Sequence, residues 1–457
     1  MIRKIIILTS IVVYSVLSQE LFTEDEIKKY MTHENPYVYT SLGKKYIYEQ
    51  KLNYAMGEYD TNVLAKYEDK EYPVSYGKYY TIGLEKPLEN GVDMSVSYRY
   101  ADGTQEYNNI KTSQDGELIL GIKVPVISLF SQIDKRRLNV GLASNDVVKT
   151  DFQYKESMRS LYYNITQNYY KLLYLRSLCE IYKRLLLKVE KRYAFLEQGV
   201  EKGNVSEMKL IELKQQVINA EQMVISADTN YNNQFMNFIK FINLSKKNFD
   251  EKYILPELPK IEATNIEFDN AMNIALQNRV DLKIFNNEIQ KVNLKQKYTQ
   301  LLKYPDLHVG LYGVYDMKDD SEHYDQTGFK VTLNMSFPIE QSKYSANNLE
   351  NKYSLTLLDA DKKRLFLELE TNLKNIIFSL YALEKNIEKS QNELELIKKL
   401  ENMEKKKYDL GSSTLFMLNQ REIQTIETEK KLLKNTLEYL LIYQEYINET
   451  NLYSAGS

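Results

Sequence analysis

The sequence predicts a mainly α protein with a smaller β component, built as two structural repeats of long coiled-coil helices and short strands. Glycine (16) and proline (8) are scarce among the 457 residues, so few positions interrupt regular structure. Two long stretches carry apolar residues at the coiled-coil spacing, and four short stretches alternate between apolar and polar residues. Together these observations indicate long, uninterrupted helices beside a set of two-faced strands.

Residues 1–18 have the pattern of a secretory signal peptide. Arg3 and Lys4 precede a mostly apolar run, and Ser18 is the small residue before the expected cleavage at Gln19. A buried N-terminal strand or helix is the other interpretation of this run. No later segment approaches the ~18 consecutive apolar residues that a membrane-spanning helix needs. We therefore expect the protein to leave the cytoplasm, and any insertion into a membrane to depend on strands.

The composition argues against several functional classes. The net charge is −3, from 60 basic and 63 acidic residues, so no excess of positive charge indicates nucleic-acid binding. Cys179 is the only cysteine, which excludes an intramolecular disulfide. The three histidines, His33, His308 and His323, lie in unrelated segments without a metal-binding spacing. We expect no enzymatic activity, no cofactor and no bound metal.

Four short stretches predict strands, arranged as two pairs. The first pair covers residues 92–100 and 117–124, and the second covers residues 306–315 and 327–337. Each stretch alternates between apolar and polar side chains, as a strand with two different faces does. In a membrane channel one face would meet lipid and the other water, whereas in a soluble sheet one face would cover a core. The alternation alone leaves both interpretations open.

A proline ends each strand pair, Pro125 in the first half and Pro338 in the second, and a long helical pattern follows it. These prolines mark the expected strand-to-helix transitions. Between residues 158 and 200 the apolar and tyrosine positions recur about every 3.5 residues, the period of a coiled coil. A similar stripe runs from residue 365 to residue 400.

Both long helical patterns stop at a glycine turn. Gly203 is followed by Ser206, and Gly411 by Thr414; glycine commonly ends a helix, and Ser or Thr commonly begins one. From proline to glycine the first pattern spans 78 residues and the second 73, roughly 110 Å of helix in either case. We therefore expect two tight helix reversals at the same level of a repeated structure.

The agreement between the two halves predicts two repeats joined by a linker. A polar stretch with two prolines is the natural boundary between them. The expected organisation is a signal peptide at 1–18, a first repeat at 19–245 with strand segments at about 56–125, a linker or equatorial segment at 246–267, and a second repeat at 268–457 with strands at about 305–338 and helices at 341–449.

These features together resemble the outer membrane factor family, the TolC-like channel subunits of bacterial efflux pumps and type I secretion systems. The resemblance rests on the Asn-Arg-Val-Asp-Leu sequence at 278–282, the proline-ended strand pairs and the two glycine turns, of which the segment 408–418 is the closer copy. It covers nearly the whole mature chain. The first half departs from the family pattern by carrying further strand-like segments between residues 56 and 87, which leaves open which of its segments form strands.

The resemblance implies the outer membrane efflux protein fold: a homotrimer in which each protomer gives four strands to a trimeric 12-stranded β-barrel and its long helices to a hollow α-barrel. It implies a passive outer-membrane channel subunit with a periplasmic helical extension, which exports substrates by efflux or type I secretion. The implied partners are outer-membrane lipid, a periplasmic adaptor (membrane fusion) protein and an inner-membrane transporter. The candidate adaptor-docking residues are the helix-turn tips, Gly203, Ser206, Gly411 and Thr414.

Two acidic residues near the second turn are the pore or gate candidates that the resemblance suggests. Glu401 and Glu404 are three residues apart and so share a helical face. Three copies would crowd carboxylates that repel one another and hold cations. The other interpretation is an ordinary solvated face, because lysines follow directly. The turn residues likewise have a simpler explanation in helix capping.

A periplasmic adaptor or a structural coiled-coil protein is the alternative function. Adaptors also use long helical hairpins, but usually one hairpin with an N-terminal anchor, whereas this sequence predicts two hairpins. A soluble coiled-coil scaffold would not need four alternating strands that end at prolines.

Overall fold

The computed structural model describes residues 19–72, 75–104, 115–202, 206–262, 265–317 and 327–452. The expected signal peptide, residues 1–18, lies outside this range. The chain divides into two compact units, each built from separate segments. The helical unit lies within residues 1–40, 156–279 and 368–457, and the sheet unit comprises residues 41–155 and 280–367.

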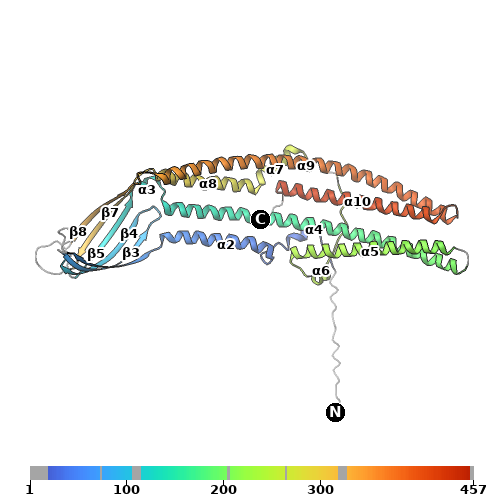
Figure 1. The fold of residues 1–457 in the computed structure, drawn as a ribbon, viewed down its shortest axis with the longest axis horizontal. Coiled ribbons are helices and arrows are strands. Elements are labelled where there is room, and N and C mark those ends of the chain that lie inside the picture. Colours follow the sequence, from blue (N-terminus) through green and yellow to red (C-terminus); the bar gives the residue numbers. More distant parts are fainter. Residues whose placement is uncertain are drawn as a thin grey trace, which may run out of the picture. The chain divides into compact units, whose positions relative to one another are not determined.

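The sheet unit contains a six-stranded antiparallel sheet (Figure 1). The strands lie in the order β2-β3-β4-β5-β7-β8, so β5 of the first half pairs with β7 of the second. Their bounds are β2 (Asn62–Tyr72), β3 (Ser75–Pro87), β4 (Asp93–Thr104), β5 (Glu117–Pro125), β7 (Asp306–Asp316) and β8 (Thr327–Ser336). The helices of this unit are α2 (Pro36–Met56), η1 (Gly57–Tyr59), α3 (Val126–Ser131), α8 (Val280–Leu301) and parts of α4 (Lys135–Glu201) and α9 (Ser342–Asp409).

The expectation of four strands is wrong, because β2 and β3 add a second hairpin to the first half. The expected four strands are present as β4, β5, β7 and β8. β3 pairs with β4 from Pro87↔Asp93 to Tyr76↔Thr104, and β2 pairs with β3 along its whole length. A tight turn makes this possible: the Leu88 N–H donates to the Val92 carbonyl at 2.8 Å, and Gly91 adopts φ +92°, which favours glycine.

The long helices expected after the two prolines are present, but neither begins directly at its proline. After Pro125 the short α3 ends at Gln132, which is left-handed at φ 53°. Asp134 then begins α4, since its carboxylate accepts from the Arg137 N–H at 2.8 Å and pairs with the Arg137 guanidinium at 2.9 Å. In the second half β8 ends at Ser336 and α9 begins at Ser342.

The helical unit consists of paired helices with two apolar cores. Its elements are α1 (Glu24–Lys28), α5 (Glu207–Ile242), α6 (Lys246–Lys252), α7 (Phe268–Asn278), α10 (Leu415–Thr450), the remaining parts of α4 and α9, and a two-stranded parallel sheet of β1 (Glu20–Leu21) and β6 (Tyr253–Ile254). The first core joins α7, α9 and α10 through residues such as Leu373 and Tyr439. The second joins α4 and α5 through residues such as Leu185 and Leu213, with Leu415 of α10.

An aromatic cluster anchors the start of the chain in the helical unit. Phe22 is fully buried, with its ring centre 4.9 Å from that of Tyr253 and 5.2 Å from that of Phe249. The Glu24 carboxylate accepts hydrogen bonds from the hydroxyls of Tyr162 and Tyr170 on α4. It also accepts one from Gln444 of α10, at 3.2 Å. The Phe22 ring and the Glu24 carboxylate therefore contact segments that lie more than a hundred residues away in sequence.

Within the part of the chain that the structure describes, no helix is long and apolar enough to cross a membrane.

Candidate functional site

The sheet has one apolar face, and that face is exposed. The strand registers place apolar side chains in continuous rows; one row is Val63, Leu84, Val96 and Leu120, one residue from each of four neighbouring strands. Sixteen large apolar side chains of this face are exposed: Val63, Tyr67, Tyr80, Ile82, Leu84, Met94, Val96, Tyr100, Leu120, Ile122, Leu311, Tyr315, Phe329, Val331, Leu333 and Met335. An apolar surface of this extent marks contact with another apolar phase.

The opposite face of the same sheet is mostly polar. Arg99 and Glu117 lie directly opposite each other on β4 and β5 and form an ion pair in which the Glu117 side chain is only 7% exposed. At the helix-side end, the His308 imidazole lies 2.9 Å from the Asp306 carboxylate. Most other positions of this face carry Ser, Thr, Asn, Lys, Asp or Gly. The alternation that the sequence showed therefore separates an apolar face from a polar one.

Tyrosines follow one another across the apolar face. Tyr67, Tyr80 and Tyr100 are paired in register, with ring centres 5.0 Å apart for the first pair and 6.1 Å for the second. Phe130 and Ile339, close in sequence to Pro125 and Pro338, are more than four-fifths exposed. Exposed aromatic side chains at the ends of an apolar band are typical of the boundary between lipid and water.

The turn between α9 and α10 has the predicted geometry. Gly411 adopts φ +75°, and the Ser412 N–H donates to the Lys407 carbonyl at 2.8 Å, which closes the end of α9. Thr414 is the N-cap of α10, since its hydroxyl accepts from the Met417 N–H at 3.3 Å. The residues at this turn are thus explained by helix ending and helix capping.

The turn between α4 and α5 is described only in part. Gly203 lies outside the described residues. Ser206 occupies the N-cap position of α5, as expected, but its side chain makes no capping hydrogen bond. Its carbonyl instead accepts from the Lys209 N–H at 3.1 Å.

The two gate candidates lie on α9, and each has a partner in its own chain. Glu401 forms an ion pair of 2.8 Å with Lys188 of α4. Glu404 accepts a hydrogen bond from the Ser413 hydroxyl in the turn. Although the two carboxylates share a helical face in sequence, one is directed to a neighbouring helix and the other to the end of its own helix.

Glu401 belongs to a larger set of ion pairs, here called the charged seam, between α4 and the α9–α10 hairpin. Arg184, Lys188 and Arg192 follow at intervals of four residues along α4, so they share one face. Their carboxylate partners are Glu429 at 2.9 Å, Glu401 at 2.8 Å and Glu422 at 2.5 Å, respectively.

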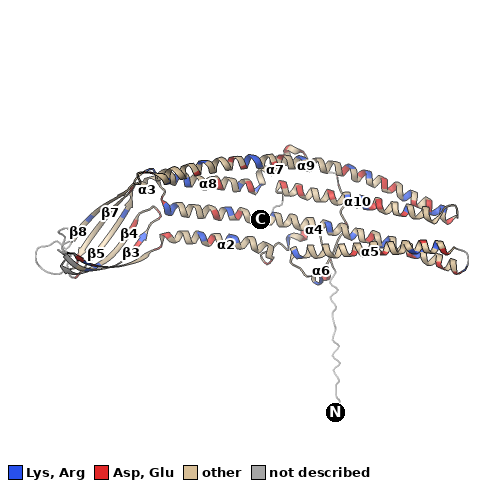
Figure 2. Cartoon of the chain, viewed as in Figure 1, with Lys and Arg blue, Asp and Glu red and all other residues tan. Residues whose placement is uncertain are grey.

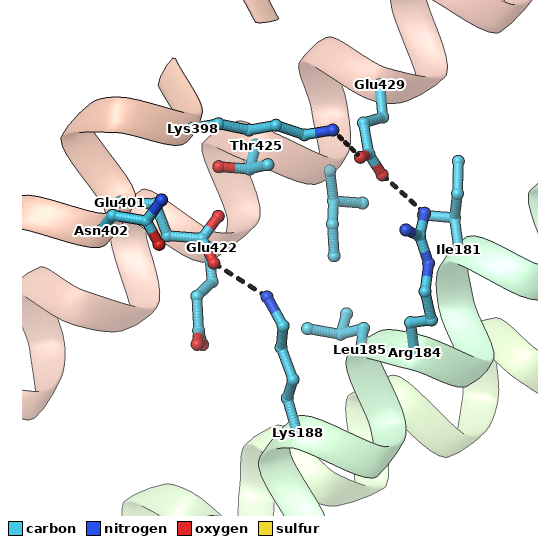
Figure 3. A pocket seen from close by; sticks show the side chains of 11 residues that line it. Ile181, Arg184, Leu185, Lys188, Lys398, Glu401, Asn402, Glu422, Thr425 and Glu429 are labelled. Carbon is cyan, nitrogen blue, oxygen red and sulfur yellow. Dashed lines mark hydrogen bonds and ion pairs between the residues drawn. The ribbon is translucent and has the colours of Figure 1, made fainter. Parts of the chain in front are cut away.

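Two ion pairs of the charged seam, Arg184–Glu429 and Lys188–Glu401, line a cavity of about 240 Å³; Figure 3 shows the side chains around it. Lys398 of α9 and Arg184 of α4 both point toward Glu429, at 3.0 and 2.9 Å. Deeper in the seam, the Arg192 guanidinium also donates to the Asn419 side chain at 2.5 Å. The Glu422 and Arg192 side chains are 7% and 14% exposed, so this pair is almost fully desolvated.

Most of the charged seam is not predictable from the sequence. Glu401 is a candidate residue in the sequence, but its partner Lys188 and the pairs at Glu422 and Glu429 are not. The only signal in the sequence is the four-residue spacing of Arg184, Lys188 and Arg192, which is also common on solvated helices. The partners lie more than two hundred residues away along the chain, so no local pattern joins them.

Other candidate chemistry has a structural explanation. Burial raises the pKa of the Cys179 thiol to about 11, so this residue is a buried thiol at neutral pH. His323 lies outside the described residues. Among those described, no group of three or more His, Cys, Asp and Glu side chains could hold a metal ion. Figure 2 shows basic and acidic residues interspersed along the helices, without a large region of one sign.

Solved structures share the overall fold of this chain. The outer membrane protein VceC of Vibrio cholerae matches with a TM-score of 0.69 and 12% identity, over 93% of this chain and 95% of that one. The CmeC outer membrane channel of Campylobacter jejuni matches with a TM-score of 0.67 and 12% identity, over 93% and 85%. The chain has the TolC-like fold of outer-membrane efflux channels.

A third match with the TolC-like fold is the open-state MtrE outer membrane channel of Neisseria gonorrhoeae. Its TM-score is 0.66 at 11% identity, over 93% of this chain and 88% of that one. No protein-family model matches the sequence, and the comparison with curated proteins gave no match. The chain therefore shares the TolC-like fold at 11–12% sequence identity, and such a low identity does not show a shared function. The similar structures are channel proteins rather than enzymes.

Proposed function

We propose that this protein is the subunit of an outer-membrane export channel. Three copies form a passive duct, with the sheets inserted in the outer membrane and the helices extending into the periplasm. The exposed apolar face of the sheet is the observation that carries this proposal. An antiparallel sheet in water covers its apolar face with a core, whereas all six strands here leave theirs exposed and have polar groups opposite.

The open sheet supports assembly from several copies. Backbone groups in lipid must be paired, so a sheet spans a membrane only as a closed barrel. Among the described residues, β2 and β8 each pair with a strand on one side only. Further copies of the chain supply the missing neighbours in this proposal.

The helix turns are the proposed docking site for a periplasmic adaptor and an inner-membrane transporter, which together open the duct for efflux or type I secretion. The closed, well-capped turn around Gly411 and Thr414 supports this role, because it presents a defined surface. Glu401 and Glu404 are the proposed gate residues. Their position on α9 within ten residues of Gly411 supports a role at the same end of the helices.

The first test is the mass and single-channel conductance of the detergent-extracted protein in a planar bilayer. We expect a trimer that inserts and conducts cations in preference to anions. A Glu401→Gln, Glu404→Gln variant should insert equally well and lose part of the cation preference. A monomer that stays in solution without detergent would overturn the proposal and favour a structural coiled-coil protein.

A matched pair of substitutions tests the lipid-facing surface directly. Val331 and Thr332 are neighbours on β8 but belong to opposite faces, the apolar and the polar one. Val331→Arg should cost about 2–4 kcal/mol in a lipid-facing strand and remove most of the protein from the membrane fraction. Thr332→Arg should leave the membrane fraction unchanged. Equal effects of the two substitutions would contradict a lipid-facing role.

A further inference from the structure

The hairpin of β2 and β3 changes the number of strands that each copy brings to the barrel. The family resemblance implies four strands per copy, but the sheet has six. We propose that β2 of one copy pairs with β8 of the next, and that the three copies close an 18-stranded barrel rather than a 12-stranded one. This inference rests on the proposed trimeric channel.

The hairpin is a full part of the sheet rather than an appendage. β2 pairs with β3 from Asn62↔Glu85 to Tyr72↔Ser75, and β3 pairs with β4 over twelve positions. Two apolar rows of this face continue through it, one at Leu84 and one at Tyr80, whereas Lys86 interrupts a third row opposite Met94. Val63 and Ile82 on this face are 71% and 59% exposed. A hairpin outside the barrel would place these side chains in water, whereas inside it they meet lipid.

The strand directions allow this closure. Every neighbouring pair in the order β2-β3-β4-β5-β7-β8 is antiparallel, and the number of strands is even. The two edge strands, β2 and β8, therefore run in opposite directions. When copies are placed side by side with the same orientation, β8 of one copy meets β2 of the next as an antiparallel neighbour. An odd number of strands would have forced a parallel pair at every junction.

The edges also suit the pairing chemically. β2 ends in a charged stretch, with Lys66, Glu68 and Lys70 joined by ion pairs of 2.7 and 3.9 Å. Charged residues on an edge discourage pairing with unrelated strands in water. The apolar positions of β8, such as Phe329 at 87% exposure, continue the apolar face up to the other edge. The occupant that fits both edges is a second copy of this chain.

The size of the resulting barrel fits the helices that adjoin it. Eighteen strands at a spacing of about 4.8 Å and a tilt of about 40° give a circumference of roughly 110 Å. The sheet unit includes parts of four long helices, α2, α4, α8 and α9, so three copies bring twelve. Twelve helices side by side at about 10 Å give a ring of roughly 120 Å. The wider barrel would therefore continue such a ring with little change in circumference.

Cysteine cross-linking between neighbouring copies tests which strand meets β8. The background is Cys179→Ser, because Cys179 is the only native cysteine. One variant adds Lys66→Cys on β2 and Thr332→Cys on β8, both on the polar face. A bismaleimide with a span of about 8 Å tolerates a shift of register by one residue pair. Lys330→Cys and Asn334→Cys replace Thr332→Cys in turn, to sample the register.

The matched control moves the first cysteine to β4. Ser97→Cys with the same β8 cysteines would cross-link only if β4, rather than β2, borders the next copy. In the 18-stranded barrel β4 lies about three strand spacings, ~14 Å, from the neighbouring β8, which is beyond the linker. We expect bands of two and three chain masses in a denaturing gel for the β2–β8 variants, and monomer for the β4–β8 variants.

The outcomes separate this inference from the proposed function. If the β4–β8 variants gave cross-linked products of two or three chain masses, and the protein were trimeric and conducting, the 18-stranded barrel would be overturned. The proposed channel function would still hold. A cross-linked β2–β8 product of a single chain mass would show that one chain closes on itself, which also overturns it. A protein that is monomeric and does not conduct would overturn the proposed function, and the inference with it.

Discussion

Two of the helix-packing interfaces in the helical unit are built from different chemistry. Within the α9–α10 hairpin the buried core is apolar: Leu373 is fully buried, and Ile376, Leu380 and Tyr439 are at most 4% exposed. Between this hairpin and α4 the contacts include the ion pairs of the charged seam beside the apolar side chain of Leu415. Buried polar residues of α10, Asn419 and Glu422 among them, contribute to the same interface.

The two interfaces therefore differ in how strongly they depend on salt concentration and pH. Burial of apolar surface depends little on salt or pH, so each hairpin is stable under most conditions. Ion pairs weaken with salt where they are exposed, and buried pairs become costly when one partner is lost. The hairpins should therefore behave as rigid bodies, and the charged seam between them as the adjustable contact.

Leu373→Ala should have the largest effect, because it empties a fully buried position in the apolar core of the α9–α10 hairpin. We expect a loss of about 3–5 kcal/mol in the free energy of unfolding. Denaturant unfolding of the detergent-extracted protein measures it. The loss should be the same at low and high salt; a loss that disappears in high salt would break the distinction between the two interfaces.

Arg192→Leu should have the next largest effect, because it leaves the Glu422 carboxylate buried without its main cation. We expect a loss of about 2–4 kcal/mol, below the figure for a fully buried pair because Arg192 keeps some solvent contact. The double variant Arg192→Leu, Glu422→Leu is the control. It should recover most of the stability, since no charge is then left unpaired. If the double variant is as unstable as the single one, packing rather than charge holds this part of the seam.

Glu445→Gln should act through pH rather than through a large change in stability. Burial, followed by the nearby Glu449 carboxylate, raises the pKa of Glu445 above its ordinary value of 4.5. Between 4.5 and the raised value the folded chain keeps a proton that the unfolded chain has lost, so stability falls as the pH rises through this window. The variant should be more stable than the parent at pH 7 and show a flatter dependence below it. Melting curves at several pH values measure this, and identical profiles would contradict it.

Lys188→Gln should have the smallest effect, although it removes the partner of Glu401. Lys188 is 54% exposed, and an ion pair with one exposed partner contributes less than about 1 kcal/mol. The small loss should vanish in high salt, because screening removes the same interaction from the parent. A loss in the free energy of unfolding as large as that of Arg192→Leu would mean that the whole charged seam is desolvated. The seam would then differ from the hairpin core in chemistry but not in burial.

Much of the fold could be predicted because its signals are local. The prolines and glycines that end the strands and long helices lie next to those ends, and the coiled-coil period is visible within one helix. The four strands with clear alternation were found for the same reason. The hairpin of β2 and β3 was left open because β2 carries Lys66, Glu68 and Lys70, which hide the apolar positions between them.

The candidate site was less accessible, because its partners meet only through tertiary packing. Arg192 and Glu422 are 230 residues apart in sequence, and each alone looks like an ordinary helix-surface residue. The helix cap at Thr414 was predictable, since capping is a local interaction. At Ser206 the same reasoning gave the right position but not the hydrogen bond.

The two open edges of the sheet have a consequence for how such a channel comes into being. Among the described residues β2 and β8 are each paired on one side only, so in the proposed channel the last stage of folding is a reaction between molecules. Its rate then depends on the concentration of chains, and an isolated copy is exposed to any other extended segment it meets. A peptide with the sequence of β8, residues 327–336, would compete for the β2 edge and terminate the ring. For the proposed channel, assembly rather than the finished duct is the stage at which we expect a small inhibitor to act most effectively.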